Sequence, residues 1–334
     1  MIEVTVLMTT YNGSLYIKPA IDSILNQTFK NFELLIVNDG STDNTIEIIQ
    51  SYDDSRIRLI NNESNKGLLF SRNIALTEAR GKYLAILDSD DIAISNRLQI
   101  QWTTFENRPS LALLGGQGLV INKKGEKTGE VLTQLTGADA VKVKLFFSNS
   151  YIHSTVMIRM EVFCKLGGYQ NFPLAEDYAL FSRLSHDYEV DNLSDILVEY
   201  RIHGENISIK RANELFSLHL PILQNRILQF GISASQDQIR WLLHPNLVQA
   251  KDIKAFKLFL ILLIRTNRKN NFLKKKIFEK KILDIWYQTI MNKVRWASFY
   301  HILTFPAFTL LESKQIRRSF KNSIKGIFIK NENR

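Results

Sequence analysis

The segment "YLAILDSDDIA" (residues 83–93) joins a run of apolar residues to a group of carboxylates. Its first five residues are typical of a strand that is buried on both faces within a parallel sheet. Asp88, Asp90 and Asp91 follow at once, although like charges so close together repel one another. Because side chains alternate along an extended segment, we expect Asp88 and Asp90 to point to the same side at the end of the strand.

Strands and helices alternate around this segment. Three further apolar runs predict strands that stop at polar turn residues: "VTVLMTTYN" (4–12), "FELLIVNDGS" (32–41) and "RIRLINNE" (56–63). Between the runs lie three amphipathic stretches that predict helices: "AIDSILNQ" (20–27), "TDNTIEIIQSY" (42–52) and "NKGLLFSRNIALTEARG" (65–81). This alternation predicts an α/β, Rossmann-like domain with a mostly parallel central sheet.

Polar side chains gather where the predicted strands end, at Thr9–Asn12, Asn38–Asp39 and Asp88–Asp91. Open sheets of this type bind ligands beyond the carboxyl ends of their strands, so these residues predict a binding site. Carboxylate oxygens suit Mg²⁺ or Mn²⁺, which proteins hold through one or two carboxylates together with substrate phosphates. In the alternative interpretation the acids only cap a following helix, with Asp90 or Asp91 as its N-cap residue.

Charge divides the chain of 334 residues into two parts. Residues 251–334 contain 20 Lys or Arg against 5 Asp or Glu, whereas residues 1–250 contain 23 against 28. The length suits about two domains. We therefore predict an α/β domain over residues 1–210 and a basic, amphipathic α-helical region over residues 211–334.

Three features of the sequence predict a cytoplasmic protein. "MIEVTVLMTT" has no basic start and alternates like a strand, so we do not expect a signal peptide there. No uninterrupted apolar run reaches the length of about 18 residues that a transmembrane helix needs. Cys164 is the only cysteine, which excludes an internal disulfide and suits a reducing compartment.

Four blocks of this sequence resemble family-2 glycosyltransferases, and they occur in the order that this family has. They are residues 4–45, "NKGLLFSRNIALTEARGKYLAILDSDD" (65–91), "GGYQNFPLAEDYALFSRL" (167–184) and "YRIHGENIS" (200–208). The resemblance covers roughly residues 2–210 and implies the GT-A fold, which binds a nucleotide-sugar. It also implies transfer of the sugar with inversion. The sequence lacks the Q-x-x-R-W pattern associated with processive synthases, which favours addition of a single sugar.

The resemblance also implies a donor site. Thr10 and Tyr11 would lie against the nucleoside base, and Asp39 would hydrogen-bond to the base edge. Arg72 would lie near the base or the diphosphate. In a simpler interpretation Asp39 only makes a turn with the glycine that follows it, and Tyr11 only packs in the core.

For the metal and the chemistry, Asp88 and Asp90 resemble the D-x-D motif. Asp90 would be the more direct ligand of Mn²⁺ or Mg²⁺, and Asp88 would lie nearer the ribose. Asp177 resembles the catalytic base, with Glu176 beside it as the alternative, and His203 resembles a histidine that closes over the metal or diphosphate. A carboxylate can serve as the base if it reaches the acceptor hydroxyl, and a divalent metal neutralises the leaving diphosphate.

Simpler interpretations exist for the catalytic residues too. Glu176 and Asp177 could only begin a helix, where acids favour the positive end of the dipole. His203 could be an ordinary loop residue, and His153 could line the acceptor side or only make core contacts. "AEDYALF" has Ala179 and Phe181 where many family members have an acid and Trp, which leaves the acceptor open.

The sequence therefore predicts a metal-dependent glycosyltransferase that uses a UDP-sugar. Its acceptor would be a glycan or lipid-linked intermediate of surface polysaccharide or lipopolysaccharide. One alternative is a nucleotidyltransferase, although "TTYNGSLYIKPA" (9–20) lacks a phosphate loop rich in Gly and basic residues. Another is a non-catalytic scaffold of the same fold. An NAD-dependent oxidoreductase is disfavoured because no G-x-G-x-x-G follows the first strand.

The basic region of residues 211–334 mixes large apolar residues with Lys and Arg, a pattern typical of helices at an anionic membrane surface. We expect peripheral attachment to the inner face of the cell membrane. Trp286, Trp296, Phe299 and Tyr300 would lie among the lipid headgroups. Alternatively, the region is a helical subdomain with solvated lysines. No nucleic-acid motif is present, so we expect no nucleic-acid partner.

Overall fold

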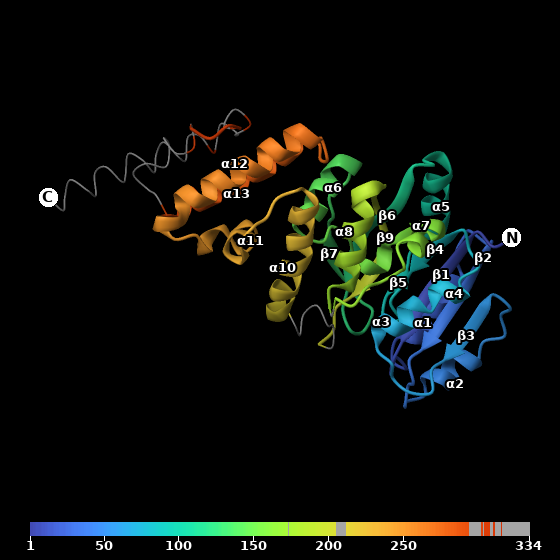
Figure 1. Cartoon of the computed structure of the whole chain (residues 1–334). Helices are drawn as coiled ribbons and strands as arrows, with labels where there is room; N and C mark the ends of the chain where they lie inside the picture. The colour runs from blue at the N-terminus through green and yellow to red at the C-terminus, as the bar shows by residue number, and fades with distance from the viewer. Residues whose placement is uncertain are drawn as a thin grey trace. The chain divides into compact units, whose positions relative to one another are not determined.

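The computed structural model describes residues 1–172, 174–204 and 212–293, together with residues 302, 304–307, 310 and 315. Contacts divide the chain into two compact units, Met1–Leu218 and His219–Arg334. The predicted boundary at residue 210 falls within residues 205–211, outside the described residues. Figure 1 labels the elements of both units, and each unit is considered by itself below.

The first four strands of unit 1 form the parallel part of its sheet. They are β1 (Val4–Thr10), β2 (Phe32–Asn38), β3 (Ile57–Asn61) and β4 (Tyr83–Ile86). They lie in the order β3-β2-β1-β4, and every neighbouring pair is parallel. The predicted α/β fold is confirmed, because parallel pairing places the carboxyl ends of these strands at one edge.

The sheet continues beyond β4 with strands of mixed direction. They are β8 (Met157–Arg159), β6 (Leu111–Ile121), β9 (Glu189–Arg201) and the short β5 (Ile92–Ala93), with β7 (Lys127–Leu132) beside β6. β8 runs antiparallel to both β4 and β6, and β9 runs parallel to β6. Because β9 also pairs with β5, the end of β9 lies beside the acidic segment that precedes β5.

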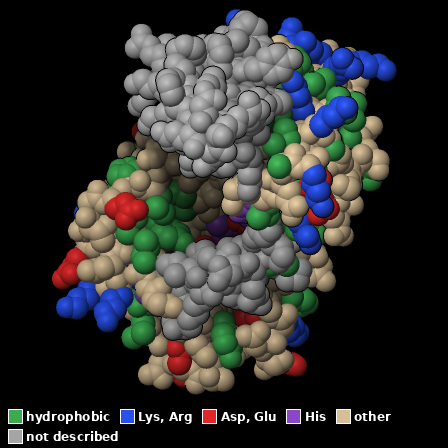
Figure 2. All heavy atoms as spheres, turned by 90° about the vertical axis from the view of Figure 1, so that its left-hand side faces the viewer, with side chains coloured by type: hydrophobic (Ala, Val, Ile, Leu, Met, Phe, Trp, Pro, Cys, Tyr) green, Lys and Arg blue, Asp and Glu red, His purple; other side chains and the backbone are tan. Residues whose placement is uncertain are grey.

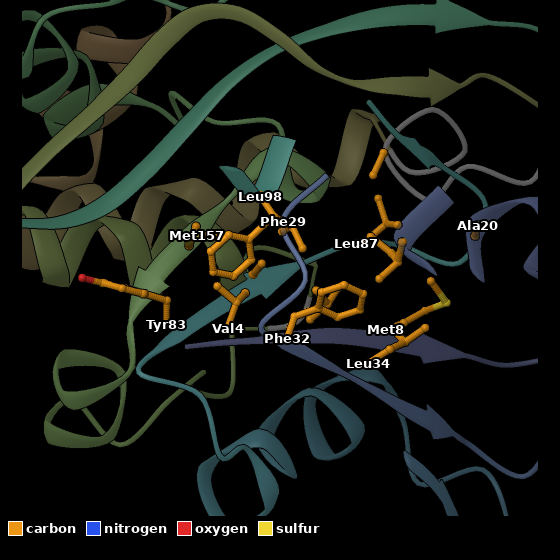
Figure 3. Packing of buried hydrophobic residues seen from close by; sticks show 14 of the residues in the cluster. Val4, Met8, Ala20, Phe29, Phe32, Leu34, Tyr83, Leu87, Leu98 and Met157 are labelled. Carbon is orange, nitrogen blue, oxygen red and sulfur yellow. The ribbon is translucent and has the colours of Figure 1, made fainter. Parts of the chain in front are cut away.

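Helices cover the parallel strands through apolar faces. α1 (Ile17–Leu25) turns Ile17, Ala20, Ile21 and Ile24 inward, as a period of 3.6 residues predicts. These residues join one buried cluster with side chains of β1, β2, β4 and of α5 (Arg97–Asn107). Figure 3 shows part of this cluster, including Phe32 of β2 and Tyr83 of β4. The packed core holds the strand ends rigidly, as a binding site requires.

The remaining helices of unit 1 are shorter or lie on the second half of the sheet. They are α2 (Thr45–Gln50), α3 (Leu68–Asn73), α4 (Ala75–Glu78), α6 (Ala138–Phe147), α7 (Met160–Lys165), α8 (Glu176–Asp187) and the 3-10 turn η1 (His153–Thr155). The single helix predicted over residues 65–81 is therefore two short helices. Gly81 allows a close approach, since a Cβ there would lie 2.3 Å from the backbone N of Thr5.

Unit 2 is helical, as predicted for this part of the chain. Its elements are α10 (Ala212–Gln229), which begins before the boundary, α11 (Gln236–Leu243), α12 (Ile253–Asn270) and α13 (Lys275–Lys293), with 3-10 turns at Pro245–Leu247 and Ala250–Asp252. Arg268 of α12 makes two hydrogen bonds to Glu279 of α13, at 2.6 and 2.9 Å. No helix among the described residues is long and apolar enough to cross a membrane.

The membrane role predicted for Trp286 is wrong. Its side chain is fully buried and stacks on Phe305, with 5.5 Å between the ring centroids. The apolar residues of α13 point into unit 2, so this indole contributes to the core and does not reach lipid headgroups. Trp296, Phe299 and Tyr300 lie outside the described residues.

Candidate active site

The acidic segment after β4 forms a turn. The backbone N–H of Asp91 donates a hydrogen bond to the carbonyl of Asp88 at 3.1 Å, so residues 88–91 do not continue the strand. The predicted alternation of side chains along an extended segment is therefore wrong. The capping alternative is wrong too, because Ile92 and Ala93 pair with β9, and α5 begins at Arg97 with Asn96 as its N-cap residue.

Asp88 is held by three neighbours. Ser154 Oγ donates a hydrogen bond to Asp88 Oδ2 at 3.0 Å, and His153 Nδ1 lies 3.2 Å from Asp88 Oδ1. Arg72 Nη2 lies 3.3 Å from the same oxygen. Burial by itself would raise the pKa of Asp88, but these neighbours, His153 foremost, outweigh burial and hold the pKa well below its usual range. Asp88 is therefore ionised at neutral pH.

Asp90 and Asp91 are affected mainly by burial and by neighbouring carboxylates. Burial and then the charge of Asp88 raise the pKa of Asp90, even though His203 Nε2 lies 2.9 Å from Asp90 Oδ2. Burial, followed by the charges of Asp90 and Asp88, raises the pKa of Asp91 well above its usual value. Asp91 accepts a hydrogen bond from the backbone N–H of Arg201 at 2.7 Å, and no residue in the described part of the chain donates to its Oδ2. Burial and mutual repulsion therefore disfavour the ionised forms of Asp90 and Asp91 beside the charged Asp88.

A divalent cation at Asp88 and Asp90 would relieve this repulsion and favour the ionised form of both carboxylates. Within the described ranges, no three His, Cys, Asp or Glu side chains gather around one metal position. A closed set of protein ligands is not needed, because Mg²⁺ and Mn²⁺ bound with substrate phosphates take only one or two carboxylates from the protein. The two oxygen-donor side chains thus suit an open metal site.

The end of β9 brings His203 to this turn. The imidazole of His203 stacks on the ring of Tyr16, with 5.1 Å between their centroids. The guanidinium carbon of Arg201 lies 4.7 Å from the centroid of the same ring, and Arg201 Nε donates to the carbonyl of Asp90 at 2.8 Å. Tyr16, which precedes α1, was not predicted as a site residue, and no local pattern in the sequence marks it.

The residues predicted to hold the nucleoside base lie at the ends of β1 and β2. The backbone N–H of Asp39 donates to the carbonyl of Thr10 at 2.8 Å, which places these two residues together. Among the described residues, none hydrogen-bonds to the buried Thr10 Oγ1, whereas Tyr11 is 50% exposed. An exposed ring beside an unpaired hydroxyl suits contact with a ligand.

The carboxylate of Asp39 is held by other loops. Asn62 Nδ2 donates to Asp39 Oδ1 at 2.7 Å, and the backbone N–H groups of Lys66 and Gly67 each donate at 2.9 Å. Burial alone would raise the pKa of Asp39, but these hydrogen bonds together lower it. Asp39 thus orders the segment that leads into α3. The simpler interpretation, in which Asp39 only makes a turn with Gly40, does not explain these hydrogen bonds.

Glu176 and Asp177 begin α8, and they have different partners. Arg72 Nη1 lies 2.6 Å from Glu176 Oε1. Asn149 Nδ2 donates to Asp177 Oδ2 at 2.9 Å, and the backbone N–H of Tyr178 donates to Asp177 Oδ1 at 2.6 Å. Glu176 is thus committed to an ion pair, whereas Asp177 has only neutral donors.

The structure brings the predicted site residues into two connected groups. Asp88, Glu176 and Arg72 form one chain of ion pairs, and His203 pairs with Asp90 on the same turn as Asp88. The sequence left two roles open for His153, and Ser154 and Asn149 were not predicted as site residues. No motif marks these three residues in the sequence, and they lie more than 60 positions after Asp88.

Comparisons with known proteins identify the family of this chain. The family model of glycosyl transferase family 2 matches residues 5–166. An uncharacterized glycosyltransferase of Methanocaldococcus jannaschii is 35% identical over 63% of this chain and 74% of its own length. The UDP-Glc:alpha-D-GlcNAc-diphosphoundecaprenol beta-1,3-glucosyltransferase WfgD of Escherichia coli is 30% identical over 64% of this chain and 82% of its own length.

Solved structures share the fold at low sequence identity. TarS 1–349 of S. aureus in complex with UDP-GlcNAc has a TM-score of 0.58 at 18% identity and covers 85% of this chain and 89% of its own. The mannosyltransferase PcManGT of Pyrobaculum calidifontis in complex with GDP-Man and Mn²⁺ has a TM-score of 0.55 at 14% identity over 96% and 87% of the two chains. The sheet and the relatives lead to one conclusion: this chain is a glycosyltransferase and belongs to glycosyl transferase family 2.

Proposed function

We propose that this enzyme transfers a single sugar, with inversion at the anomeric carbon, from a UDP-sugar to a glycan or lipid-linked acceptor. One observation carries the proposal. Arg72 contacts both Asp88, after β4, and Glu176, at the start of α8. The candidate metal carboxylates and the candidate base at Asp177 therefore belong to one site, as a displacement reaction needs.

Asp177 is the base in this proposal. Its carboxylate accepts hydrogen bonds from Asn149 and from the backbone of Tyr178, which fix its orientation. It takes the proton from the acceptor hydroxyl while that oxygen attacks the anomeric carbon. Glu176 neutralises Arg72 instead and keeps the guanidinium in place.

Asp90, Asp88 and His203 are the proposed residues around a bound Mn²⁺ or Mg²⁺. When present, the metal supplies Lewis-acid neutralisation of the diphosphate that leaves the sugar. The repulsion between Asp88 and Asp90, which a cation would relieve, supports this assignment, and so does the Mn²⁺ bound to the mannosyltransferase with the same fold. His203 is kept beside Asp90 by its stacking on Tyr16.

Thr10, Tyr11 and Asp39 are the proposed contacts of the nucleoside, and Arg72 lies nearer the diphosphate end of the donor. The ring of Tyr11 is exposed for stacking, and the unpaired hydroxyl of Thr10 offers a hydrogen bond. Uridine nucleotides are the proposed donors, because TarS was crystallised with UDP-GlcNAc and the Escherichia coli relative is described as using UDP-Glc.

The proposed acceptor is an intermediate of surface polysaccharide or lipopolysaccharide. A relative is described as acting on a GlcNAc-diphosphoundecaprenol, and another is described as an O-antigen biosynthesis glycosyltransferase. Residues 1–210 would form the catalytic domain. The basic residues 211–334 would keep the enzyme at the anionic inner face of the cell membrane, where such acceptors lie.

Isothermal titration tests the donor and the metal together. UDP, GDP, TDP and CMP are titrated with and without Mn²⁺ into the wild type, Asp90→Ala and the control Asp53→Ala, which changes an exposed aspartate outside the site. We expect UDP to bind in a metal-dependent way, with this dependence lost only in Asp90→Ala. Equal weak binding of all nucleotides, indifferent to metal and substitution, would contradict the proposal.

A further inference from the structure

One face of α12 presents leucines and cations to solvent. Leu258 is 60% exposed and Leu262 is 45% exposed, and Lys254, Arg265 and Lys269 are exposed as well. At about 100° of rotation per residue, these five side chains lie within a sector of about 80°. We call these five residues the outer face of α12.

The opposite side of α12 is part of the core of unit 2. Its buried residues are Ile253, Phe256, Phe259, Leu260, Leu263, Ile264 and Asn267. The helix is therefore anchored through one side, and the two leucines of the outer face are not needed for that packing. α13 differs, because its large apolar residues Ile282, Leu283, Trp286 and Ile290 are all buried. Leu258 and Leu262 of α12 instead form an apolar stripe one turn long at the surface.

The charge of the outer face is uniformly positive. The sequence of α12, "IKAFKLFLILLIRTNRKN", contains no acidic residue. Arg268 is paired with Glu279, but within the described ranges Lys254, Arg265 and Lys269 make no ion pair. Lys254 and Arg265 lie about 16 Å apart along the axis, and the leucines lie between them. Figure 2 views the molecule from the left-hand side of Figure 1, and on this face Lys and Arg side chains lie next to hydrophobic side chains.

We propose that the outer face of α12 docks on an anionic lipid surface with the helix axis parallel to the membrane plane. Leu258 and Leu262 enter the boundary between headgroups and acyl chains, and the three cations contact lipid phosphates. This inference deepens the membrane attachment in the proposed function, which rests on composition, by assigning it to one helix and one face.

Charge argues for lipid and against a second copy of this chain. Symmetric pairing of two outer faces would bring three cations of each copy toward those of its partner, and like charges across an interface oppose association. An anionic lipid surface complements the same cations. The leucines are too few to hold the protein without them, so both parts of the face are required.

The test measures sedimentation of the full chain with vesicles of phosphatidylcholine and phosphatidylglycerol, and with vesicles of phosphatidylcholine alone. We expect binding only to the anionic vesicles. Each neutralised cation lowers affinity about fivefold, so Lys254→Gln/Arg265→Gln/Lys269→Gln weakens binding about 100-fold. Leu258→Ser/Leu262→Ser also weakens it, because the apolar anchor is lost.

Matched controls change the same residue types away from this face. Lys30→Gln/Lys123→Gln/Lys124→Gln removes three exposed cations of unit 1, and Leu228→Ser/Leu247→Ser removes two exposed leucines of unit 2. Both controls should bind the vesicles like the wild type. Equal loss in the controls, or unchanged binding in the α12 variants, overturns the proposal. A change in self-association without a change in vesicle binding would instead show that this face joins two copies.

The outcome separates this inference from the proposed function. The α12 variants should bind UDP with Mn²⁺ like the wild type, since the outer face belongs to unit 2 and not to the strand ends of unit 1. Loss of vesicle binding with UDP binding retained supports the α12 assignment. Vesicle binding in a protein that binds no nucleotide would support the docking surface and contradict the proposed function.

Discussion

Arg72 Nη1 lies 2.6 Å from Glu176 Oε1, although 104 positions separate the two residues in the sequence. The second terminal nitrogen of the same guanidinium lies 3.3 Å from Asp88 Oδ1. The Arg72 side chain is only 8% exposed, so both ion pairs lie largely out of water. One buried cation thus connects the turn after β4 to the start of α8, and it holds the two halves of the candidate site at a constant distance.

Arg72→Ala is expected to destabilise the protein strongly. Removal of Arg72 leaves the largely buried carboxylate of Glu176 without its cation and takes one of three neighbours from Asp88. Removing one partner of a buried ion pair typically costs about 3–5 kcal/mol. Urea unfolding measures the free energy of unfolding. The control Lys18→Ala breaks an exposed pair with Asp22, where the Lys18 side chain is 66% exposed. It should cost no more than about 1 kcal/mol. Similar losses in both variants would show that the Arg72 pairs contribute no more than a surface contact.

Asp177→Asn is expected to lower kcat by about 10²–10⁴-fold, because the amide cannot accept the proton of the acceptor. The KM for the donor should change little, since the substituted group acts only in the chemical step. Asn149→Ala should lower kcat about tenfold, because Asp177 loses the hydrogen bond to Oδ2 that orients it. Steady-state assays of UDP release measure all of these values.

Two further variants test this assignment. Asp187→Asn changes an exposed acid at the other end of α8, where the side chain is 66% exposed, and should leave kcat unchanged. Glu176→Gln should act mainly on stability through Arg72. If Glu176→Gln lowers kcat as much as Asp177→Asn while stability is retained, the base is Glu176.

Asp39→Asn is expected to destabilise the protein at neutral pH and much less in acid. The side-chain NH₂ group of the new Asn would face the backbone N–H of Lys66 or Gly67, so one of these donors would lose its acceptor. An unsatisfied buried donor lowers the free energy of unfolding by about 1–3 kcal/mol. The pKa of Asp39 is lowered in the folded state, so its contribution is present above the usual value of about 3.9. It is lost as the pH falls through the folded pKa.

Urea unfolding of the wild type and Asp39→Asn between pH 8 and pH 3 measures this dependence. The difference between their free energies of unfolding should be constant above about pH 5 and shrink below about pH 4. Asp53→Asn, at an exposed position, should show a small difference throughout. A difference for Asp39→Asn that persists into acid would show that side-chain shape, and not the carboxylate charge, is responsible.

The apolar runs predicted the first four strands well, and the acids after β4 predicted a site at their carboxyl ends. These features depend on local backbone geometry, because the side-chain period of a strand or helix appears in a few consecutive residues. The same reasoning predicted the helices of the basic region. It also predicted wrongly that the extended segment continues through Asp90. The hydrogen bond from the backbone N–H of Asp91 to the carbonyl of Asp88 closes a turn there, and the pattern of apolar residues does not predict that turn.

The contacts that assemble the site could not be read from local patterns. His203 reaches Asp90 across 113 positions only because β9 pairs with both β6 and β5. Trp286, which composition alone associates with a membrane, is buried, while Leu258 on the neighbouring helix is exposed. Local sequence specifies which residues form an element and which face is apolar. The pairing of distant strands and the packing of faces specify which side chains meet, because those choices depend on the free energy of the whole fold.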